Sequence, residues 1–305
     1  MFIDFKQAFG YIDSPKTIQI LQELRIPNKL VRLIKMTIQN KKTSVKIENI
    51  SSNPFLISSG VRQGDPLSAT IFNLMLDSVI KKLNVRGDVS LKLKQIAAYA
   101  DYVALLARSL KALKEIFHEL QNEATLLGLS INEGKTKYLQ IKITAIKDIT
   151  HLKIENFALE SVENFNYLGS ILNSDNKTNI EIAERIENGK KACYASAKLI
   201  KSKFLTKNTK MKIYKTIRPV VMYSSESWTS TAKYENNVRI FEMQILRKIF
   251  GPVNIDNIWR IRNGMKIDKL IEGADIVRFI KAQRIKWLGH IQRMEQGRPA
   301  RKLLD

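Results

Sequence analysis

Cysteine and histidine are scarce in this chain of 305 residues, which contains one cysteine and three histidines. The single thiol, Cys193, cannot form a disulfide framework within the chain. His118, His151 and His290 are too scattered along the sequence for the ligand spacing of a zinc site. The sequence therefore predicts neither disulfides nor a zinc centre.

Long apolar runs are also missing. No stretch approaches the roughly 18 consecutive apolar residues that a membrane span requires. The N-terminal sequence MFIDFKQAF has no cationic start followed by an apolar stretch and a cleavage site. These absences predict an intracellular chain that is neither secreted nor inserted in a membrane.

Acidic residues are few relative to basic ones. The chain has 51 lysines and arginines against 29 aspartates and glutamates, a formal net charge of +22. The excess is uneven, because residues 1–179 have a net charge of +7 and residues 180–305 have one of +15. Such an excess favours a polyanionic partner, most simply nucleic acid, through neutralisation of phosphates. The alternative is a basic surface that only keeps the chain soluble.

The hydrophobic pattern divides the chain near residue 175. Before it, short β-type runs alternate with helical ones, which predicts an α+β domain over residues 1–175. Strands are expected at 2–5, 45–50 and 137–144, a hairpin at 97–107, and helices at 70–83 and 110–129. Residues 176–305 are expected to form an all-α, basic region.

Two apolar faces with helical spacing support the second region. They consist of Val238, Phe241, Ile245 and Ile249, and of Ile276, Ile280, Trp287 and Ile291. Gly251 and Pro252 end the first. The aromatic side chains Trp228, Phe241 and Trp287 are expected in the core, and the neighbouring lysines and arginines are expected to contact phosphates.

Two aspartates lie in apolar strands about a hundred residues apart. Asp4 is in FIDFKQAF, and Asp101 lies at the tip of the hairpin in AAYADYVALLA. Two such acids on neighbouring strands would repel each other unless a cation lay between them, which favours Mg²⁺ and two-metal phosphoryl transfer. Each acid alone is more typical of a turn or a helix cap.

A glycine-rich turn precedes the helix expected at 70–83. In SSGVRQGDPLSAT, the residues Arg62, Gln63 and Gly64 lead through Pro66 into the helix. Here the backbone can approach a flat or anionic ligand closely. The alternative is an ordinary turn into a helix.

In order and spacing, FIDFKQAF, GVRQGDPLSA, YADY, GLSINEGKTKYL and FNYLGS closely resemble the palm motifs of reverse transcriptases of non-LTR (LINE-type) retrotransposons. The resemblance covers residues 1 to about 172, and the helical tail is a softer match. It implies a polymerase palm, an antiparallel sheet with packed helices, followed by a thumb-like helical region. It also implies RNA-directed DNA polymerase activity in the nucleus or cytoplasm. The implied partners are an RNA template, a DNA primer and deoxynucleoside triphosphates, with two Mg²⁺ ions, or Mn²⁺, as cofactors.

Residue by residue, the resemblance implies that Asp4, the Phe5 carbonyl and Asp101 hold metal. Lys135 matches the lysine near the triphosphate, although by itself it would be taken for a surface lysine. Phe9 matches the side chain that screens the sugar 2′ position. Arg62, Gln63 and Gly64 match the nucleotide-binding turn, and Tyr167, Leu168 and Gly169 match the primer grip.

The sequence departs from the family pattern at several positions. The second acid of the hairpin motif is Tyr102, a neutral phenol and a poor Mg²⁺ ligand. Gly10 stands where the family usually has another acid, and Ala69 replaces a common proline. Asp13 and Asp65 do not compensate, because each precedes a proline-containing helix start and is expected to be a cap.

The chain also begins at the first metal-binding strand, so the preceding fingers segment is expected to be missing. Two hypotheses follow. The chain is either an impaired polymerase domain that still extends primers, or a remnant that only binds nucleic acid through its basic tail. A fragment without any stable function is a third possibility, because the palm sheet would have an exposed edge.

Overall fold

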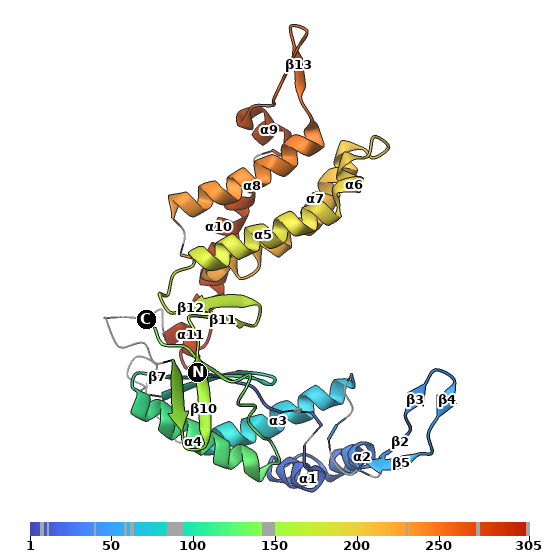
Figure 1. Ribbon diagram of the computed structural model, residues 1–305, viewed down its shortest axis with the longest axis vertical. Coiled ribbons are helices and arrows are strands. Elements are labelled where there is room, and N and C mark those ends of the chain that lie inside the picture. Colours follow the sequence, from blue (N-terminus) through green and yellow to red (C-terminus); the bar gives the residue numbers. More distant parts are fainter. Residues whose placement is uncertain are drawn as a thin grey trace. The chain divides into compact units, whose positions relative to one another are not determined.

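The computed structural model describes residues 1–6, 9–10, 12–39, 41–57, 60–61, 64–83, 94–141, 150–229, 231–272 and 275–302. The chain forms two compact units, Met1–Gln140 with Thr144–Glu163, and Ile141–Ile143 with Asn164–Asp305 (Figure 1). The hairpin at 164–173 therefore packs with the second unit. The functional boundary expected near residue 175 stays a prediction.

The first unit is built on a mixed, mostly antiparallel sheet. Its strand order is β6-β7-β1-β8-β10-β9, and its pairs are antiparallel except for β8 with β10. The strands are β1 (Phe2–Ile3), β6 (Lys94–Tyr99), β7 (Tyr102–Ala107), β8 (Lys137–Tyr138), β9 (His151–Ile154) and β10 (Phe157–Ser161). The short N-terminal strand β1 thus lies inside the sheet, between β7 and β8, and the predicted α+β fold class is confirmed.

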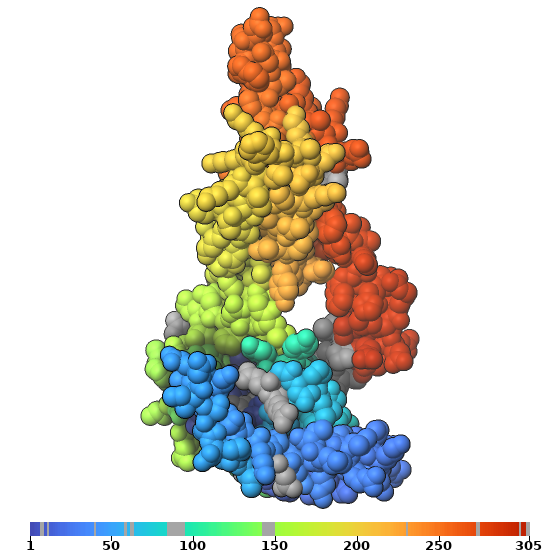
Figure 2. Space-filling view, turned by 90° about the vertical axis from the view of Figure 1, so that its right-hand side faces the viewer, coloured from blue at the N-terminus to red at the C-terminus, as the bar shows by residue number. Residues whose placement is uncertain are grey.

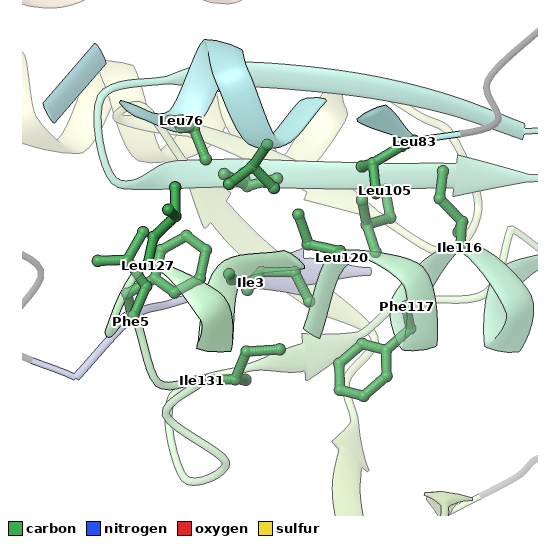
Figure 3. Packing of buried hydrophobic residues seen from close by; sticks show 14 of the residues in the cluster. Ile3, Phe5, Leu76, Leu83, Leu105, Ile116, Phe117, Leu120, Leu127 and Ile131 are labelled. Carbon is green, nitrogen blue, oxygen red and sulfur yellow. The ribbon is translucent and has the colours of Figure 1, made fainter. Parts of the chain in front are cut away.

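Helices α3 (Pro66–Lys82) and α4 (Leu110–Leu126) cover one face of this sheet and enclose the core. Figure 3 shows side chains of both helices and of β1 and β7 packed together, among them Leu76, Leu120, Ile3 and Leu105. Helices α1 (Ser14–Glu23) and α2 (Asn28–Ile38) precede them in the chain.

Both expected caps are confirmed. Asp13 accepts a hydrogen bond from the Lys16 backbone N–H at 3.0 Å, and Asp65 accepts one from Leu67 at 3.0 Å. Each aspartate satisfies an N–H group that the first helical turn leaves unpaired. Neither carboxylate is therefore a substitute for the acid that is absent at Tyr102.

Two small hairpins lie between α2 and α3. Strand β2 (Lys41–Thr43) pairs with β5 (Phe55–Ile57), and β3 (Lys46–Ile47) pairs with β4 (Ile50–Ser51). The single strand expected at 45–50 is thus two short strands, because Glu48 has a φ of 53° and reverses the chain. Of the strand expected at 137–144, β8 covers Lys137–Tyr138, and residues 142–144 lie outside the described residues.

The second unit is mainly helical. Its helices are α5 (Asn179–Ala195), α6 (Ala197–Lys201), α7 (Lys207–Met222), the 3₁₀ turn η1 (Ser225–Ser227), α8 (Ala232–Phe250), α9 (Gly264–Leu270), α10 (Ile276–Gln292) and α11 (Pro299–Lys302). The face predicted on α8 is buried in the core, together with Tyr214, Val221 and Trp228. In the ranges that the structure describes, no helix combines the length and apolarity needed to cross a membrane.

Two hairpins interrupt the helices of this unit. Strand β11 (Asn164–Tyr167) pairs with β12 (Ser170–Asn173), and β13 (Val253–Ile255) pairs with β14 (Ile258–Arg260). The second hairpin projects from its neighbouring helices (Figures 1 and 2) and corrects the all-α prediction for residues 176–305. Its turn residues Asp256 and Asn257 have φ values of 52° and 62°, the conformation that joins two strands tightly.

The prediction that Trp287 belongs to the core is wrong. Its side chain is 44% exposed and lies beside His290, with the ring centroids 5.3 Å apart. Buried residues of α10 are confined to its first two turns, at Ile276, Val277 and Ile280. The apolar residues keep helical spacing as far as Trp287, but neighbouring elements cover only the start of α10. Trp228 and Phe241 are buried, as predicted.

Candidate active site

Asp4 faces away from the core because β1 alternates. Ile3 and Phe5, on either side of it, are 3% and 4% exposed and point into the core (Figure 3). Successive side chains of an extended chain point to opposite faces, so Asp4 lies on the face opposite that core. Its carboxylate is partly exposed and has no hydrogen-bond or ion-pair partner among the described residues.

Asp101 lies in the two-residue turn between β6 and β7. Tyr99 pairs with Tyr102, which leaves Ala100 and Asp101 as the turn. Ala100 has a φ of 50°, a left-handed conformation that costs a residue other than glycine about 1–2 kcal/mol. A tight two-residue hairpin turn requires this conformation. Like Asp4, the Asp101 carboxylate has no partner in the described part of the chain.

The sheet register sets Asp4 beside the end of the hairpin that contains Asp101. Phe2 pairs with Ala104 and Ile3 with Val103, so the next step of the register places Asp4 opposite Tyr102, the residue after Asp101. Side chains at opposed positions of an antiparallel pair share a face and lie about 5 Å apart at Cβ. The residue at the closest position to Asp4 is thus the tyrosine that replaces the second acid.

The backbone of Phe5 faces the same place. Lys6 donates to the Ser130 carbonyl and Asn132 donates to the Asp4 carbonyl, each at 2.8 Å, on either side of the Phe5–Ile131 bridge. In such a pair the backbone groups of the bridged residue point away from that partner. The Phe5 carbonyl is therefore directed toward the β7 side, where Asp101 lies.

The loop before β8 is bound directly to Asp4. The fully buried Thr136 accepts a hydrogen bond from the Asp4 backbone N–H, with 3.2 Å between nitrogen and Oγ1. Lys135 therefore precedes a residue that contacts Asp4, and its side chain is exposed and unpaired in the described part of the chain. Sequence reasoning missed Thr136, although its position directly after Lys135 in the motif was a usable signal.

The neighbouring Lys137 is engaged and so differs from Lys135. Its ammonium donates to the Gly134 carbonyl at 2.7 Å and to the Glu160 carboxylate at 2.5 Å. The hydrogen bond and charge of Lys137 lower the pKa of Glu160 below its usual value. Of these two lysines, Lys135 is the one left to meet an anion.

Phe9 and the glycine-rich turn are held next to each other. The Val61 N–H donates to the Phe9 carbonyl at 2.8 Å, and the Gly60 N–H donates to the Ile12 carbonyl at 2.9 Å. The Phe9 ring packs on Phe72 of α3, with 5.1 Å between centroids. A bulky ring is thus placed beside the start of the turn that contains the predicted nucleotide-binding residues.

The turn itself leaves space for a ligand at Gly64. Gly64 has a φ of 92°, and no described atom lies within 4 Å of the position that a Cβ would take. Gly60, by contrast, lies directly on Gly10, whose carbonyl oxygen would be 2.5 Å from such a Cβ. Arg62 and Gln63 lie outside the described residues.

The predicted primer grip lies in the second unit, at the turn of the β11–β12 hairpin. Tyr167 pairs with Ser170, and Leu168 and Gly169 form the turn. Burial raises the pKa of the partly buried Tyr167. A groove of about 270 Å³ adjoins the turn and is lined by this hairpin and α5.

A mostly antiparallel sheet with helices on one face, and with acids in or beside its central strands and hairpin turn, is typical of polymerase palms. A family model for reverse transcriptase (RNA-dependent DNA polymerase) matches residues 1–172. Because the match covers more than half of the chain, the chain belongs to the reverse transcriptase family.

Individual proteins agree with this assignment. The RNA-directed DNA polymerase from mobile element jockey of Drosophila funebris is 28% identical over 263 residues, which cover 82% of this chain and 28% of the relative. The Pol polyprotein from type-2 retrotransposable element R2DM of Drosophila melanogaster is 25% identical over 194 residues, 60% of this chain and 18% of the relative. The chain thus spans less than a third of either relative, and the resemblance to non-LTR retrotransposon enzymes is confirmed.

Among solved structures, this chain is similar to a telomerase from Candida albicans in complex with a fragment of telomeric RNA. The aligned region covers 93% of this chain and 48% of the telomerase chain. The sequence identity is 12% and the TM-score is 0.39.

Proposed function

We propose that the chain acts as the RNA-directed DNA polymerase domain of a non-LTR retrotransposon and extends a DNA primer on an RNA template. The observation that carries the proposal is the β1–β7 register, which sets Asp4 one step from the hairpin turn that contains Asp101, with both carboxylates unpaired among the described residues. Membership of the reverse transcriptase family supports it. The chain would act in the nucleus or the cytoplasm.

The donor set fits a divalent cation. Asp4, Asp101 and the Phe5 carbonyl supply hard oxygen ligands of the kind that Mg²⁺ takes. Carboxylates that converge on one site repel each other, and a cation bound between Asp4 and Asp101 would relieve that repulsion. When bound, two Mg²⁺ ions, or Mn²⁺, would polarise the primer 3′ hydroxyl and neutralise charge on the triphosphate.

The chain's own residues would supply the rest of the site. Phe9 would screen the sugar 2′ position, and Gly64, with Arg62 and Gln63, would let the backbone approach the incoming nucleotide. As the primer 3′ oxygen bonds to the α-phosphorus and pyrophosphate leaves, the Lys135 ammonium would neutralise or protonate the leaving group.

Tyr102 lowers the expected rate. It occupies the position opposite Asp4, where the family has a carboxylate, and its neutral phenol adds no negative charge at pH 7. A loss of about 4 kcal/mol of transition-state stabilisation would reduce the rate by a factor of about 10³. We therefore expect weak activity.

Nucleic-acid binding without catalysis is the second candidate function, and Tyr102 is the observation that favours it. The net charge of +15 over residues 180–305 would neutralise phosphates of a hybrid whether or not the palm is active. Both candidate functions require an affinity for an RNA–DNA hybrid that falls as the salt concentration rises.

Primer extension on an RNA template, in Mg²⁺ and in Mn²⁺, tests the proposal. The starting chain is compared with Asp101→Asn, Tyr102→Asp and the matched control Tyr102→Asn, which has the same shape as the aspartate but no charge. We expect weak primer extension by the starting chain. Asp101→Asn should abolish it, Tyr102→Asp should increase it at least tenfold, and Tyr102→Asn should leave it weak.

Two other outcomes overturn the catalytic proposal. Extension that survives Asp101→Asn would show that this carboxylate is not part of the site. If no variant extends the primer but salt-dependent binding of the hybrid is retained, nucleic-acid binding without catalysis would be the function that remains supported.

A further inference from the structure

The turn between β11 and β12 has an unusual backbone. Leu168 has a φ of 50° and Gly169 one of 81°, so both central residues are left-handed, as in a type I′ hairpin turn. Glycine adopts this conformation readily, but leucine does not. The two central carbonyls of such a turn take no part in the ladder, so they are open to water or to other groups of the protein.

Two side chains from the helical part of the unit donate hydrogen bonds to those carbonyls. The Tyr223 hydroxyl donates to the Leu168 carbonyl at 2.8 Å, and Arg185 Nη2 donates to the Gly169 carbonyl. The Tyr223 ring also lies on Gly169, since its Cε1 atom would be 3.5 Å from a Cβ there. The tip of the hairpin is therefore held through both of its turn residues.

The two holding side chains also support each other. The Arg185 guanidinium lies over the Tyr223 ring, with Cζ 4.6 Å from the centroid, which is cation–π geometry. Tyr223 follows α7, whereas Arg185 is on α5, so the pair joins two helices that pack together. The turn is therefore tied to both helices.

Glu181 completes the arrangement one helical turn before Arg185. One of its carboxylate oxygens accepts from Arg185 Nε at 2.7 Å, and the other accepts from the Ile171 backbone N–H at 2.7 Å. The side chains of Glu181 and Arg185 are only 5% and 12% exposed. A largely buried pair in which both partners also bind the hairpin backbone is held in one geometry more firmly than a surface ion pair.

We propose that Glu181, Arg185 and Tyr223 are positioning residues that fix the turn of the primer grip, and through it the 3′ end of a DNA primer. This inference rests on the proposed function. From outside the hairpin, Tyr223 and Arg185 bind the turn at Leu168 and Gly169, and Glu181 binds Ile171 of β12. They therefore set the orientation of its tip without forming its ladder.

The groove beside the turn has the chemistry of a polynucleotide site. Asn164, Asn166, Asn188 and Arg185 line it together with one acid, Glu184, which accepts a hydrogen bond from the Asn188 amide at 3.3 Å. Amide and guanidinium groups bind phosphate and sugar oxygens without regard to base sequence. The primer strand backbone is therefore the occupant that we expect next to the held turn.

The test uses the full chain and Tyr223→Phe, which keeps the ring on Gly169 and under Arg185 but removes the hydroxyl bound to Leu168. The matched control is Tyr194→Phe on α5, because Tyr194 is 85% exposed. Arg185→Lys and Arg185→Gln test the second contact, since lysine keeps the charge and can still donate to Gly169.

Two measurements separate turn position from overall folding. Amide hydrogen exchange follows peptides that contain residues 165–173, with peptides of α8 as internal reference. The fluorescence of 2-aminopurine at the primer 3′ end of an RNA–DNA hybrid then reports the position of the terminus, while titration of the same hybrid gives its affinity.

For Tyr223→Phe we expect exchange at the turn to rise about threefold to fivefold, the effect of one exposed hydrogen bond. The terminal fluorescence should change, while hybrid affinity and exchange in α8 stay within twofold. Arg185→Gln should have a larger effect that Arg185→Lys partly restores, and Tyr194→Phe should have none.

The remaining outcomes overturn the inference in different ways. Unchanged exchange at 165–173 in Tyr223→Phe would mean that the side chain does not hold the turn. Raised exchange with unchanged terminal fluorescence would mean that the turn is held but does not position a primer. Failure of the starting chain to bind the hybrid would overturn the proposed function itself, and the primer role with it.

Discussion

Asp4, the residue after β1, and Tyr102, the first residue of β7, lie one step beyond the pair of Ile3 with Val103, so the register extended by one step sets them opposite each other. Their side chains therefore share the face of the sheet that is opposite the core. An acid at the second position would place three carboxylates at this point, whereas the chain has two. Among the described residues no cluster of three acids, histidines or cysteines is suited to holding a metal.

Adding the missing charge should strengthen metal binding. Tyr102→Asp is expected to raise Mn²⁺ affinity about tenfold, equivalent to about 1.4 kcal/mol, because a third carboxylate would face the ion. Asp101→Asn should lower the affinity. Electron paramagnetic resonance of free Mn²⁺ measures both, with Tyr102→Asn as the uncharged control. Equal affinities in Tyr102→Asp and Tyr102→Asn would contradict a metal site at this position.

A methyl group at Gly60 should unfold the turn beside Phe9. A Cβ at this position would lie 2.5 Å from the Gly10 carbonyl oxygen, and the φ of 78° disfavours alanine. We expect Gly60→Ala to lower the unfolding free energy by about 2–4 kcal/mol, from both terms. Gly64→Ala is the matched control, since it carries only the backbone cost of about 1 kcal/mol. Circular dichroism during urea unfolding measures both stabilities. Equal stability of the two variants would contradict the close contact of Gly60 with Gly10.

Gly189 is packed as closely in the helical unit, so a methyl group there should also lower stability. A Cβ there would lie 2.4 Å from Val221 Cγ2 and 2.8 Å from Phe241 Cζ. Although alanine is the better helix former, Gly189→Ala should destabilise the unit by about 1–3 kcal/mol through overpacking. Unfolding can be followed by the fluorescence of the buried Trp228.

Two further variants isolate that steric effect. Gly289→Ala on α10 meets only the flexible end of Arg293, 3.3 Å away, and should be neutral or stabilising. Val221→Ala should reduce the cost of Gly189→Ala, because it removes the nearest atom. Strict additivity of the two substitutions would count against the contact.

The buried Glu242 should make stability depend on pH. Its carboxylate accepts from Tyr214 at 2.5 Å and from the Ile276 N–H at 2.9 Å, but burial raises its pKa above the usual value. A carboxyl group with a raised pKa binds protons more tightly in the folded state, so stability falls as pH rises from the unfolded pKa through the folded one. The difference in unfolding free energy between the starting chain and Glu242→Gln should shrink over that range. A difference that is flat with pH would show that Glu242 is not perturbed.

Local sequence was sufficient to predict much of the candidate site. The two apolar strands with Asp4 and Asp101, the helix after Pro66, and the caps at Asp13 and Asp65 were all predicted correctly. Each of them depends on neighbours within a few residues, through alternation, helical period or a side chain that reaches its own helix. The spacing of the motifs then supplied the family.

Tertiary structure decided what distant segments do to one another. The contacts of Gly60 with Gly10, of Thr136 with Asp4, and of Tyr223 with Leu168 join residues 50 to 132 positions apart. No periodicity in the sequence encodes such pairs, because they arise from how the elements pack. The same reason explains Trp287, which keeps the helical period of a buried residue and is nevertheless exposed, since only the start of α10 is covered.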